Sequence, residues 1–116
     1  MCVPPTFLCL DQGTTARIVF RDIRDATGEL FDPSGSTVQA QVRARVHSET
    51  ILHEWSTALG NVETALGTVA LVVEPIVSSA WTWSLGVYDA ELTDPDGRVS
   101  RLGNGLIYVS RETTRS

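Results

Sequence analysis

Apolar and polar residues alternate along much of the chain, and this pattern predicts short β-strands. The clearest alternation spans residues 37–46, where valines and alanines at every second position would face one way. Residues 68–74 are apolar at nearly every position, which is typical of a central strand covered on both faces. Further strands are predicted at residues 7–10, 14–21, 51–57 and 98–110, and in a segment that begins at Trp81.

The segment from Trp81 to Leu102 contains the strongest turn signal, Asp94-Pro95-Asp96-Gly97. Proline presets φ for the first corner of a turn, aspartate bonds to its own backbone, and glycine accepts a left-handed conformation. We therefore expect a hairpin of two long strands. Gly103-Asn104-Gly105 interrupts its second strand and predicts a bulge or a close backbone approach.

The remaining segments predict connections and very little helix. Residues 58–67, with two glycines and an asparagine, are expected to form a loop, and Pro75 suits the first position of one short helical turn. Seven to eight strands with at most one such turn predict an all-β fold, a single antiparallel β-sandwich of immunoglobulin-like type. The cysteine-tryptophan-cysteine core of antibody domains is absent.

A length of 116 residues fits one domain over residues 1–116. Its ends are expected to be an extended arm at residues 1–6, which contains Pro4-Pro5, and a flexible tail at residues 111–116. The absence of a signal-peptide pattern and of a long apolar run predicts a soluble protein.

The net charge and the number of cysteines argue against some classes of function. The net charge of −5 argues against a general nucleic-acid binder, which would carry a basic patch. All nine basic residues are arginine, which fits either a GC-rich genome or the use of arginine at protein interfaces. Cys2 and Cys9 are expected to be free thiols in a reducing cytoplasm, and no cysteine-histidine set predicts a zinc site.

The polar residues predict no catalytic, cofactor-binding or metal-binding site. His47 and His53 are expected to be solvated. Asp89 and Glu91 alternate on one strand face, where they would act as an acid-base pair or, as we favour, as a solvated face paired with arginines. The candidate arginines are Arg43, Arg45, Arg98 and Arg101.

Three tryptophans, Trp55, Trp81 and Trp83, allow two interpretations. They could form a stacking platform for a sugar or a base, or they could fill the core or an inter-subunit contact, and we favour the second. Burial separates the two, because a platform needs exposed rings. No glycine-rich phosphate loop or serine elbow is present, so the chain is predicted not to be an enzyme.

The order of several motifs resembles a family of small tailed-phage virion proteins of baseplate-domain type. The matching segments are Asp11-Gln12-Gly13-Thr14-Thr15, the strand at residues 37–43, the run from Tyr88 to Leu102 that reads YDAELTDPDGRVSRL, and the ending Val109-Ser110-Arg111-Glu112-Thr113-Thr114. The chain departs from the family pattern at residues 1–9 and at Gly86, where relatives often carry an aromatic residue.

The resemblance implies a non-enzymatic structural component of a phage virion, made in the host cytoplasm and located in the virion. It would act as a tail, baseplate or fibre-attachment adaptor through contacts with other virion proteins, in a symmetric multi-copy assembly. No cofactor, nucleic acid or membrane is expected as a partner. The alternatives are a capsid decoration or neck protein, and a sandwich module that binds carbohydrate or a cell surface.

The ends of the chain and one strand face are the predicted contact surfaces. Exposed arms and strand edges can extend the sheets of neighbouring subunits. The candidate interaction residues are Cys2, Val3, Pro4, Pro5, Arg43, Arg45, Arg111 and Arg115.

Overall fold

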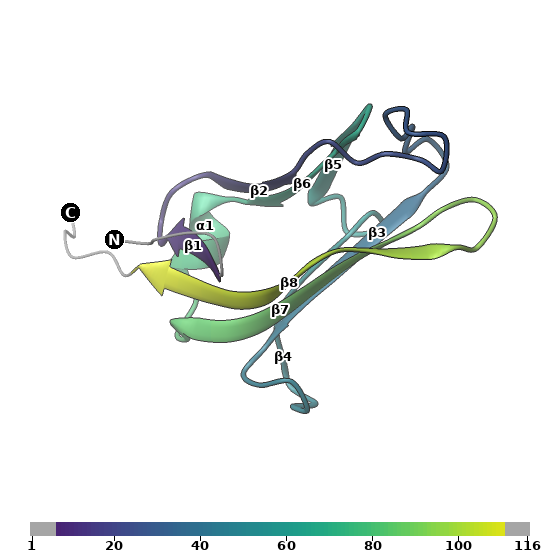
Figure 1. Cartoon of the computed structure of the whole chain (residues 1–116). Coiled ribbons are helices and arrows are strands. Elements are labelled where there is room, and N and C mark those ends of the chain that lie inside the picture. Colours follow the sequence, from purple (N-terminus) through teal and green to yellow (C-terminus); the bar gives the residue numbers. More distant parts are fainter. Residues whose placement is uncertain (1–6, 111–116) are drawn as a thin grey trace.

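The computed structural model describes residues 7–110, which form two β-sheets packed face to face (Figure 1). Eight strands and one short helix follow one another along the chain. They are β1 (Phe7–Asp11), β2 (Ala16–Phe20), β3 (Thr37–Arg43), β4 (Ile51–Ser56), β5 (Val62–Ala65), β6 (Thr68–Val73), α1 (Pro75–Ser79), β7 (Leu85–Thr93) and β8 (Val99–Ser110).

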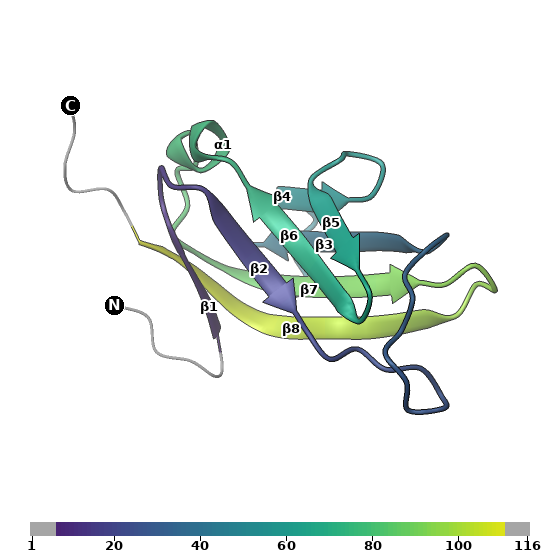
Figure 2. The same cartoon turned by 90° about the horizontal axis from the view of Figure 1, so that it is seen from above.

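The larger sheet has five strands in the order β1-β8-β7-β3-β4, and the smaller has three in the order β2-β6-β5. All neighbouring strands are antiparallel except β1 and β8, which run parallel. The predicted all-β, immunoglobulin-like sandwich is therefore confirmed, with one parallel pair added. Because β1 belongs to the large sheet and β2 to the small one, the short turn between them carries the chain across the sandwich (Figure 2).

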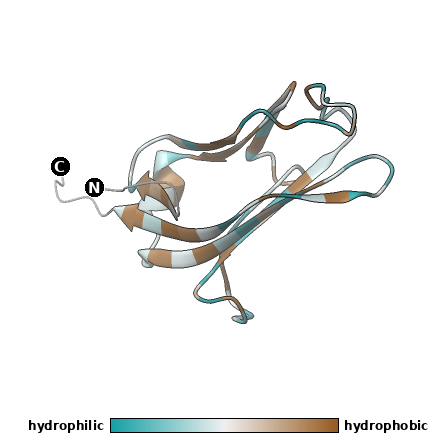
Figure 3. Ribbon diagram, viewed as in Figure 1, coloured by the Kyte–Doolittle hydropathy of each residue, from teal (hydrophilic) through white to brown (hydrophobic). Residues whose placement is uncertain are grey.

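The core lies between the two sheets and follows the predicted alternation. Val38, Ala40 and Val42 on β3 are buried, as are alternate residues of β7 and, near the end of β8, Ile107 and Val109, and Figure 3 shows this apolar alternation along the strands. Trp55 fills the centre without any exposure, and its indole Nε1 donates a hydrogen bond of 3.0 Å to the backbone oxygen of Val72. This bond satisfies the one polar atom that the ring brings into the core.

The Gln12-Gly13 step locks the β1–β2 turn onto the end of α1. The Gln12 side chain is buried, and its Nε2 donates to the backbone oxygens of Ser78 and Trp81, each at 3.1 Å. The backbone N–H of Gly13 donates to Ser78 Oγ at 2.8 Å. Of these acceptors, the backbone oxygen of Ser78 is one that the helix C-terminus leaves without an intrahelical partner. Pro75 stands at the start of the helix, as predicted.

The predicted hairpin is confirmed at its turn. Asp94 Oδ1 accepts hydrogen bonds from the backbone N–H groups of Asp96 and Arg98, each at 2.9 Å, and Gly97 has a φ of 87°. The first strand starts at Leu85 and not at Trp81, because residues 81–84 lead from the helix into the sheet. Trp81 bonds back to Ser78 there, through its backbone N–H.

The second hairpin strand contains the bulge, which was one of the two predicted alternatives. The register between β7 and β8 shifts at Ala90 and Glu91, next to Gly103. A Cβ atom on Gly103 would lie 2.8 Å from Cε1 of Phe20, so this glycine leaves room for the Phe20 ring to pack against β8.

Two strand predictions were wrong in extent. β3 ends at Arg43, so Ala44 and Val46 lie in the turn toward β4, where Val46 is 68% exposed. Residues 62–65, which were predicted as loop, form β5 and pair with β6. Within residues 7–110, the five-residue α1 is the one helix, and no helix is long and apolar enough to cross a membrane.

Candidate functional site

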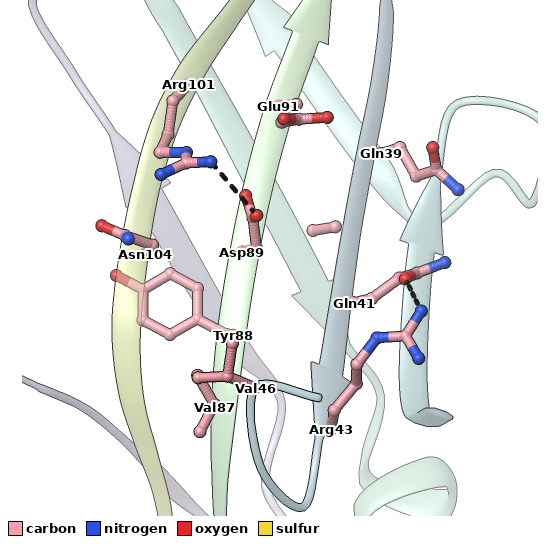
Figure 4. A pocket seen from close by; sticks show the side chains of 11 residues that line it. Gln39, Gln41, Arg43, Val46, Val87, Tyr88, Asp89, Glu91, Arg101 and Asn104 are labelled. Carbon is pink, nitrogen blue, oxygen red and sulfur yellow. Dashed lines mark hydrogen bonds and ion pairs between the residues drawn. The ribbon is translucent and has the colours of Figure 1, made fainter. Parts of the chain in front are cut away.

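The five-stranded sheet has an outer face that turns away from the smaller sheet and α1 (Figure 1). Strand register arranges the side chains of this face in rows that cross β4, β3, β7 and β8. One row contains Glu54, Gln41, Asp89 and Asn104, and the next contains Ser56, Gln39, Glu91 and Arg101. We call these two rows the polar rows, and Figure 4 shows most of their side chains together.

The carboxylate of Glu54 on β4 holds two glutamine side chains of the neighbouring strand β3 in place. Its Oε2 accepts hydrogen bonds from Nε2 of Gln39 at 3.0 Å and of Gln41 at 3.1 Å. These two bonds, with a smaller contribution from the Arg43 charge, hold the pKa of Glu54 below its ordinary value. Since each amide nitrogen carries two hydrogens, both glutamines keep a donor for a further partner.

The two arginines predicted on β3 have different surroundings. Arg43 donates from Nη1 to the backbone oxygen of Ser48 at 2.6 Å and from Nη2 to Gln41 Oε1 at 2.7 Å. It therefore fastens the β3–β4 turn to the sheet, and its head group is partly buried. Arg45 lies in that turn and is exposed. Of the pair, Arg45 is the residue whose side chain extends into solvent.

The predicted pairing of carboxylates with arginines is found at one position. Asp89 Oδ2 lies 3.7 Å from Arg101 Nη2, and both side chains are about half exposed, at 50% and 56%. Glu91 lies opposite Arg101 in register, but the ion pair forms with Asp89. An exposed pair of this kind contributes little to stability. The ion pair leaves the charges of Asp89 and Arg101 exposed on the surface that the polar rows form.

A hollow of about 410 Å³ lies over the polar rows. Its floor is formed by β3, β7 and β8, and Val46 of the β3–β4 turn stands at its rim (Figure 4). Amide, carboxylate and guanidinium groups line it together with the apolar side chain of Val87. Such a lining offers both donors and acceptors of hydrogen bonds.

The other half of the outer face is apolar. Leu85, Leu106 and Tyr108 are 57%, 44% and 38% exposed, and Val87 is partly exposed beside them. Register places Leu85 opposite Tyr108 and Val87 opposite Leu106, and the row continues through Arg43 to Ile51 on β4, which is 41% exposed. We call Leu85, Val87, Leu106, Tyr108 and Ile51 the apolar half. Contiguous exposed apolar side chains of this kind mark interaction sites.

The tryptophans belong to the interior, as we favoured from the sequence. Trp55 is fully buried, Trp81 is 8% exposed, and Trp83 is partly buried with its ring centroid 4.8 Å from that of Trp81. A stacking platform needs exposed rings, so these tryptophans do not provide one. Residues 7–110 also contain no group of three or more side chains able to hold a metal ion.

The expectation of two solvated histidines was correct for His47 and wrong for His53. His47 is exposed. His53 is partly buried, with its ring centroid 4.5 Å from that of Trp55 and 5.0 Å from that of Trp81. Its Nε2 atom is buried and has no hydrogen-bond partner among the described residues. Burial lowers the pKa of His53, and the neighbouring charge of Glu54 opposes this only in part.

The expectation of free thiols was wrong for Cys9, which is disulfide-bonded. Cys2 is the chain's one other cysteine. The predicted contact residues Cys2, Val3, Pro4, Pro5, Arg111 and Arg115 lie outside the described residues. The candidate surface consequently rests on the sheet face and on Arg43 and Arg45.

Sequence reasoning found only part of this surface. The alternation in residues 37–46 placed Gln39, Gln41 and Arg43 on one face, and Asp89 and Glu91 were singled out. Leu85, Leu106 and Tyr108 were missed because an apolar residue in a strand is ordinarily assigned to the core. A usable signal existed in β8, where Ile107 and Val109 alternate with Leu106 and Tyr108, so that both faces of the strand end are apolar.

The comparisons with known proteins found structural neighbours of low sequence identity, including the following two. No family model matches the chain, and no curated protein matches it. The immunoglobulin-like domain of mouse leukocyte-associated immunoglobulin-like receptor 1, solved as a strand-swapped dimer, matches with a TM-score of 0.49 and 14% identity over 95% of this chain and 94% of that one. CopC from Methylosinus trichosporium OB3b matches with a TM-score of 0.48 and 10% identity, over 97% and 92% of the two chains.

Proposed function

We propose that this protein is a non-enzymatic structural component of a phage virion. It acts as a tail, baseplate or fibre-attachment adaptor, through contacts with other virion proteins in a symmetric assembly. The resemblance of residues 11–15 and 88–102 to small tailed-phage virion proteins supports the virion part of the proposal. The exposed outer face of the five-stranded sheet supports the adaptor part.

The apolar half is the observation that carries the proposal. Three large side chains, Leu85, Leu106 and Tyr108, are exposed by 38–57% on adjacent strands of one sheet. Aromatic and aliphatic side chains at the centre of a patch, with polar groups around them, are the usual composition of a protein–protein interface. The polar rows border the apolar half and supply those polar groups.

The residues that carry the family resemblance have structural roles within this fold. Gln12 fastens the β1–β2 turn to α1, and the Asp94 carboxylate closes the hairpin turn by accepting hydrogen bonds from two backbone N–H groups. Both groups of contacts shape the sandwich and do not form a reactive centre. This agrees with a family whose members share a scaffold and use its surface for assembly.

The proposed contacts extend to residues that the sheet face does not include. Arg45 is exposed on the β3–β4 turn and can reach a neighbouring subunit, while Arg43 contributes mainly by holding that turn. The segments at residues 1–6 and 111–116 stay part of the proposal as contact arms.

The direct test is the location of the protein in purified particles of the phage that encodes it. We expect mass spectrometry to detect the chain in washed particles, and electron microscopy with a specific antibody to label the tail or its tip. Labelling at the capsid or at the head–tail junction would favour the alternative of a decoration or neck protein. Absence of the chain from intact particles would contradict the virion proposal.

A further inference from the structure

We propose that the outer face of the five-stranded sheet binds the same face of a second copy of this chain. This inference rests on the proposed function, because it names one partner within the multi-copy assembly. The contact would be isologous, so each residue pair across the interface occurs twice. The reason for choosing a second copy is that the face is complementary to itself.

The complementarity follows from strand order and register. Two sheets pack face to face with their strands roughly aligned, at about 30°. A two-fold axis that runs along the strands, between β7 and β3, places β7 of one copy over β3 of the other. The same axis places β8 over β4, and it keeps each row of side chains over the equivalent row of the partner.

The polar rows then meet as carboxylate against amide. Asp89 faces Gln41, Glu91 faces Gln39, and Asn104 faces Glu54, because each pair shares a row and has its members on strands that the axis exchanges. Gln39 and Gln41 each donate one amide hydrogen to Glu54, and the second amide hydrogen of each can be donated to a carboxylate of the partner copy. The hollow of about 410 Å³ over these rows leaves room for bridging water, which such interfaces commonly hold.

The same axis gives the apolar half one apolar contact, which occurs twice, while Val87 of one copy lies over Arg43 of the other. Leu106 of one copy faces Ile51 of the other, because both lie in the row that contains Arg43 and Val87. The exposed Val46 on the β3–β4 turn lies toward the side where the partner's β8 carries Leu106 and Tyr108. Side chains that are exposed in one copy, by 44% for Leu106 and 41% for Ile51, become covered.

The area of the outer face indicates how tightly two copies should bind to each other. Four strands spaced by about 4.8 Å and rows along about 20 Å of strand give a footprint of roughly 400 Å² per copy. A stable interface covers about 800 Å² per partner. The isolated dimer should therefore be weak and should depend on concentration, and a larger assembly would add further contacts.

The test is analytical ultracentrifugation of the full chain from low micromolar to near-millimolar concentration. We expect a reversible monomer–dimer equilibrium for the natural sequence. Leu106→Glu and Ile51→Lys should each shift the dissociation constant at least tenfold toward monomer. Ile76→Glu is the matched control, because Ile76 is 83% exposed on α1, away from the face, and its substitution should leave the equilibrium unchanged.

The double variant Leu106→Glu with Ile51→Lys tests the register itself. Within one chain these residues lie on strands separated by β7 and β3, about 14 Å apart, so their new charges meet only across the two-fold axis. Recovery of dimer in the double variant supports the proposed axis. Far-UV circular dichroism and thermal unfolding confirm that each variant is folded.

Three outcomes would overturn the inference. They are a natural chain that is monomeric at all concentrations, an association that responds to Ile76→Glu and not to Leu106→Glu, and a dimer that forms only after residues 1–6 are deleted. The last result would identify the N-terminal arm as the occupant of the face. A monomeric chain that is nevertheless present in phage particles would refute this inference and leave the proposed function standing.

Discussion

At the scale of single residues, Gly86 shows how tightly the large sheet is packed. A Cβ atom at this position would lie 2.6 Å from Cγ1 of Val42 and 3.0 Å from the backbone oxygen of Arg43. An aromatic side chain at this position would therefore have no space in this structure. Gly86 allows the close packing of β7 against β3 at this point.

Gly86→Ala should lower the free energy of unfolding by about 1–3 kcal/mol, because the added methyl group forces Val42 or the backbone to move. Chemical denaturation followed by tryptophan fluorescence measures this change. Gly60→Ala is a useful control, since a Cβ there meets nothing within 4 Å and the cost comes only from a φ of 78°. A Gly86→Ala variant as stable as the natural chain would contradict the packing described for this position.

His53 gives the protein a predicted dependence on pH. Burial lowers its pKa, so the unfolded chain binds the proton more tightly than the folded chain. Stability is therefore complete above the ordinary histidine pKa of about 6.5 and decreases as the pH falls below it. Carboxylates with lowered pKa values, such as Glu54 and Glu63, lose their contribution only nearer their ordinary values of about 4.3.

Urea denaturation at about pH 7.5 and about pH 5.5 measures the effect of this histidine separately from that of the carboxylates. We expect the natural chain and His47→Gln to lose stability between these two pH values, because His53 is present in both. His53→Gln should lose much less. Equal losses in all three proteins would show that His53 is not the group responsible.

At the scale of elements, the contact of Gln12 with the end of α1 determines how the chain crosses between the sheets. Gln12→Ala removes two hydrogen bonds and leaves the buried carbonyls of Ser78 and Trp81 without these donors. We expect a loss of about 2–3 kcal/mol in the free energy of unfolding. Gln39→Ala, on the exposed outer face, should change it by less than about 0.5 kcal/mol.

Thermal unfolding of both glutamine variants provides the comparison. If Gln12→Ala unfolded at the same temperature as Gln39→Ala, the Gln12 hydrogen bonds would not be what fixes the β1–β2 turn. The Gln12-Gly13 step could be recognised as a motif in the sequence, but its role could not. That role requires knowing that α1, more than sixty residues later, packs beside the turn.

The predicted strands and turns were correct where the apolar alternation of the sequence coincides with the strand pairing of the structure. The hairpin turn at Asp94 and the buried positions of β3 followed directly from turn chemistry and alternation. β5 was missed because three of its four residues are exposed, so its sequence carries no apolar alternation. β3 was extended too far because its alternation continues to Val46, although the paired part of the strand ends at Arg43.

At the scale of the whole molecule, the sequence predicted the β-sandwich but not which side chains lie together on the outer face of its five-stranded sheet. Which residues share a row depends on register between strands far apart in the chain, such as β4 and β8. The parallel pairing of β1 with β8 depends in the same way on an arrangement that no local pattern specifies. The outward position of Leu106 and Tyr108 is fixed by the pairing of β8 with β7 and not by any local pattern.

The outer face links the proposed function to the proposed self-association. A virion component assembled in many copies needs a surface that recognises its neighbours, and an isologous contact of one patch joins two copies about a two-fold axis. The apolar half and the polar rows form such a patch on a rigid sheet. Arg45, on the turn beside it, stays available for a different neighbour.

The most direct test of this surface is hydroxyl-radical footprinting of the protein in isolation at low concentration and within purified phage particles. We predict that Leu106 and Tyr108 become protected in particles, whereas Ile76 on α1 keeps a larger share of its reactivity. Protection of Ile76 with Leu106 and Tyr108 as reactive as in the isolated chain would contradict the claim that the outer face of the five-stranded sheet is the assembly surface.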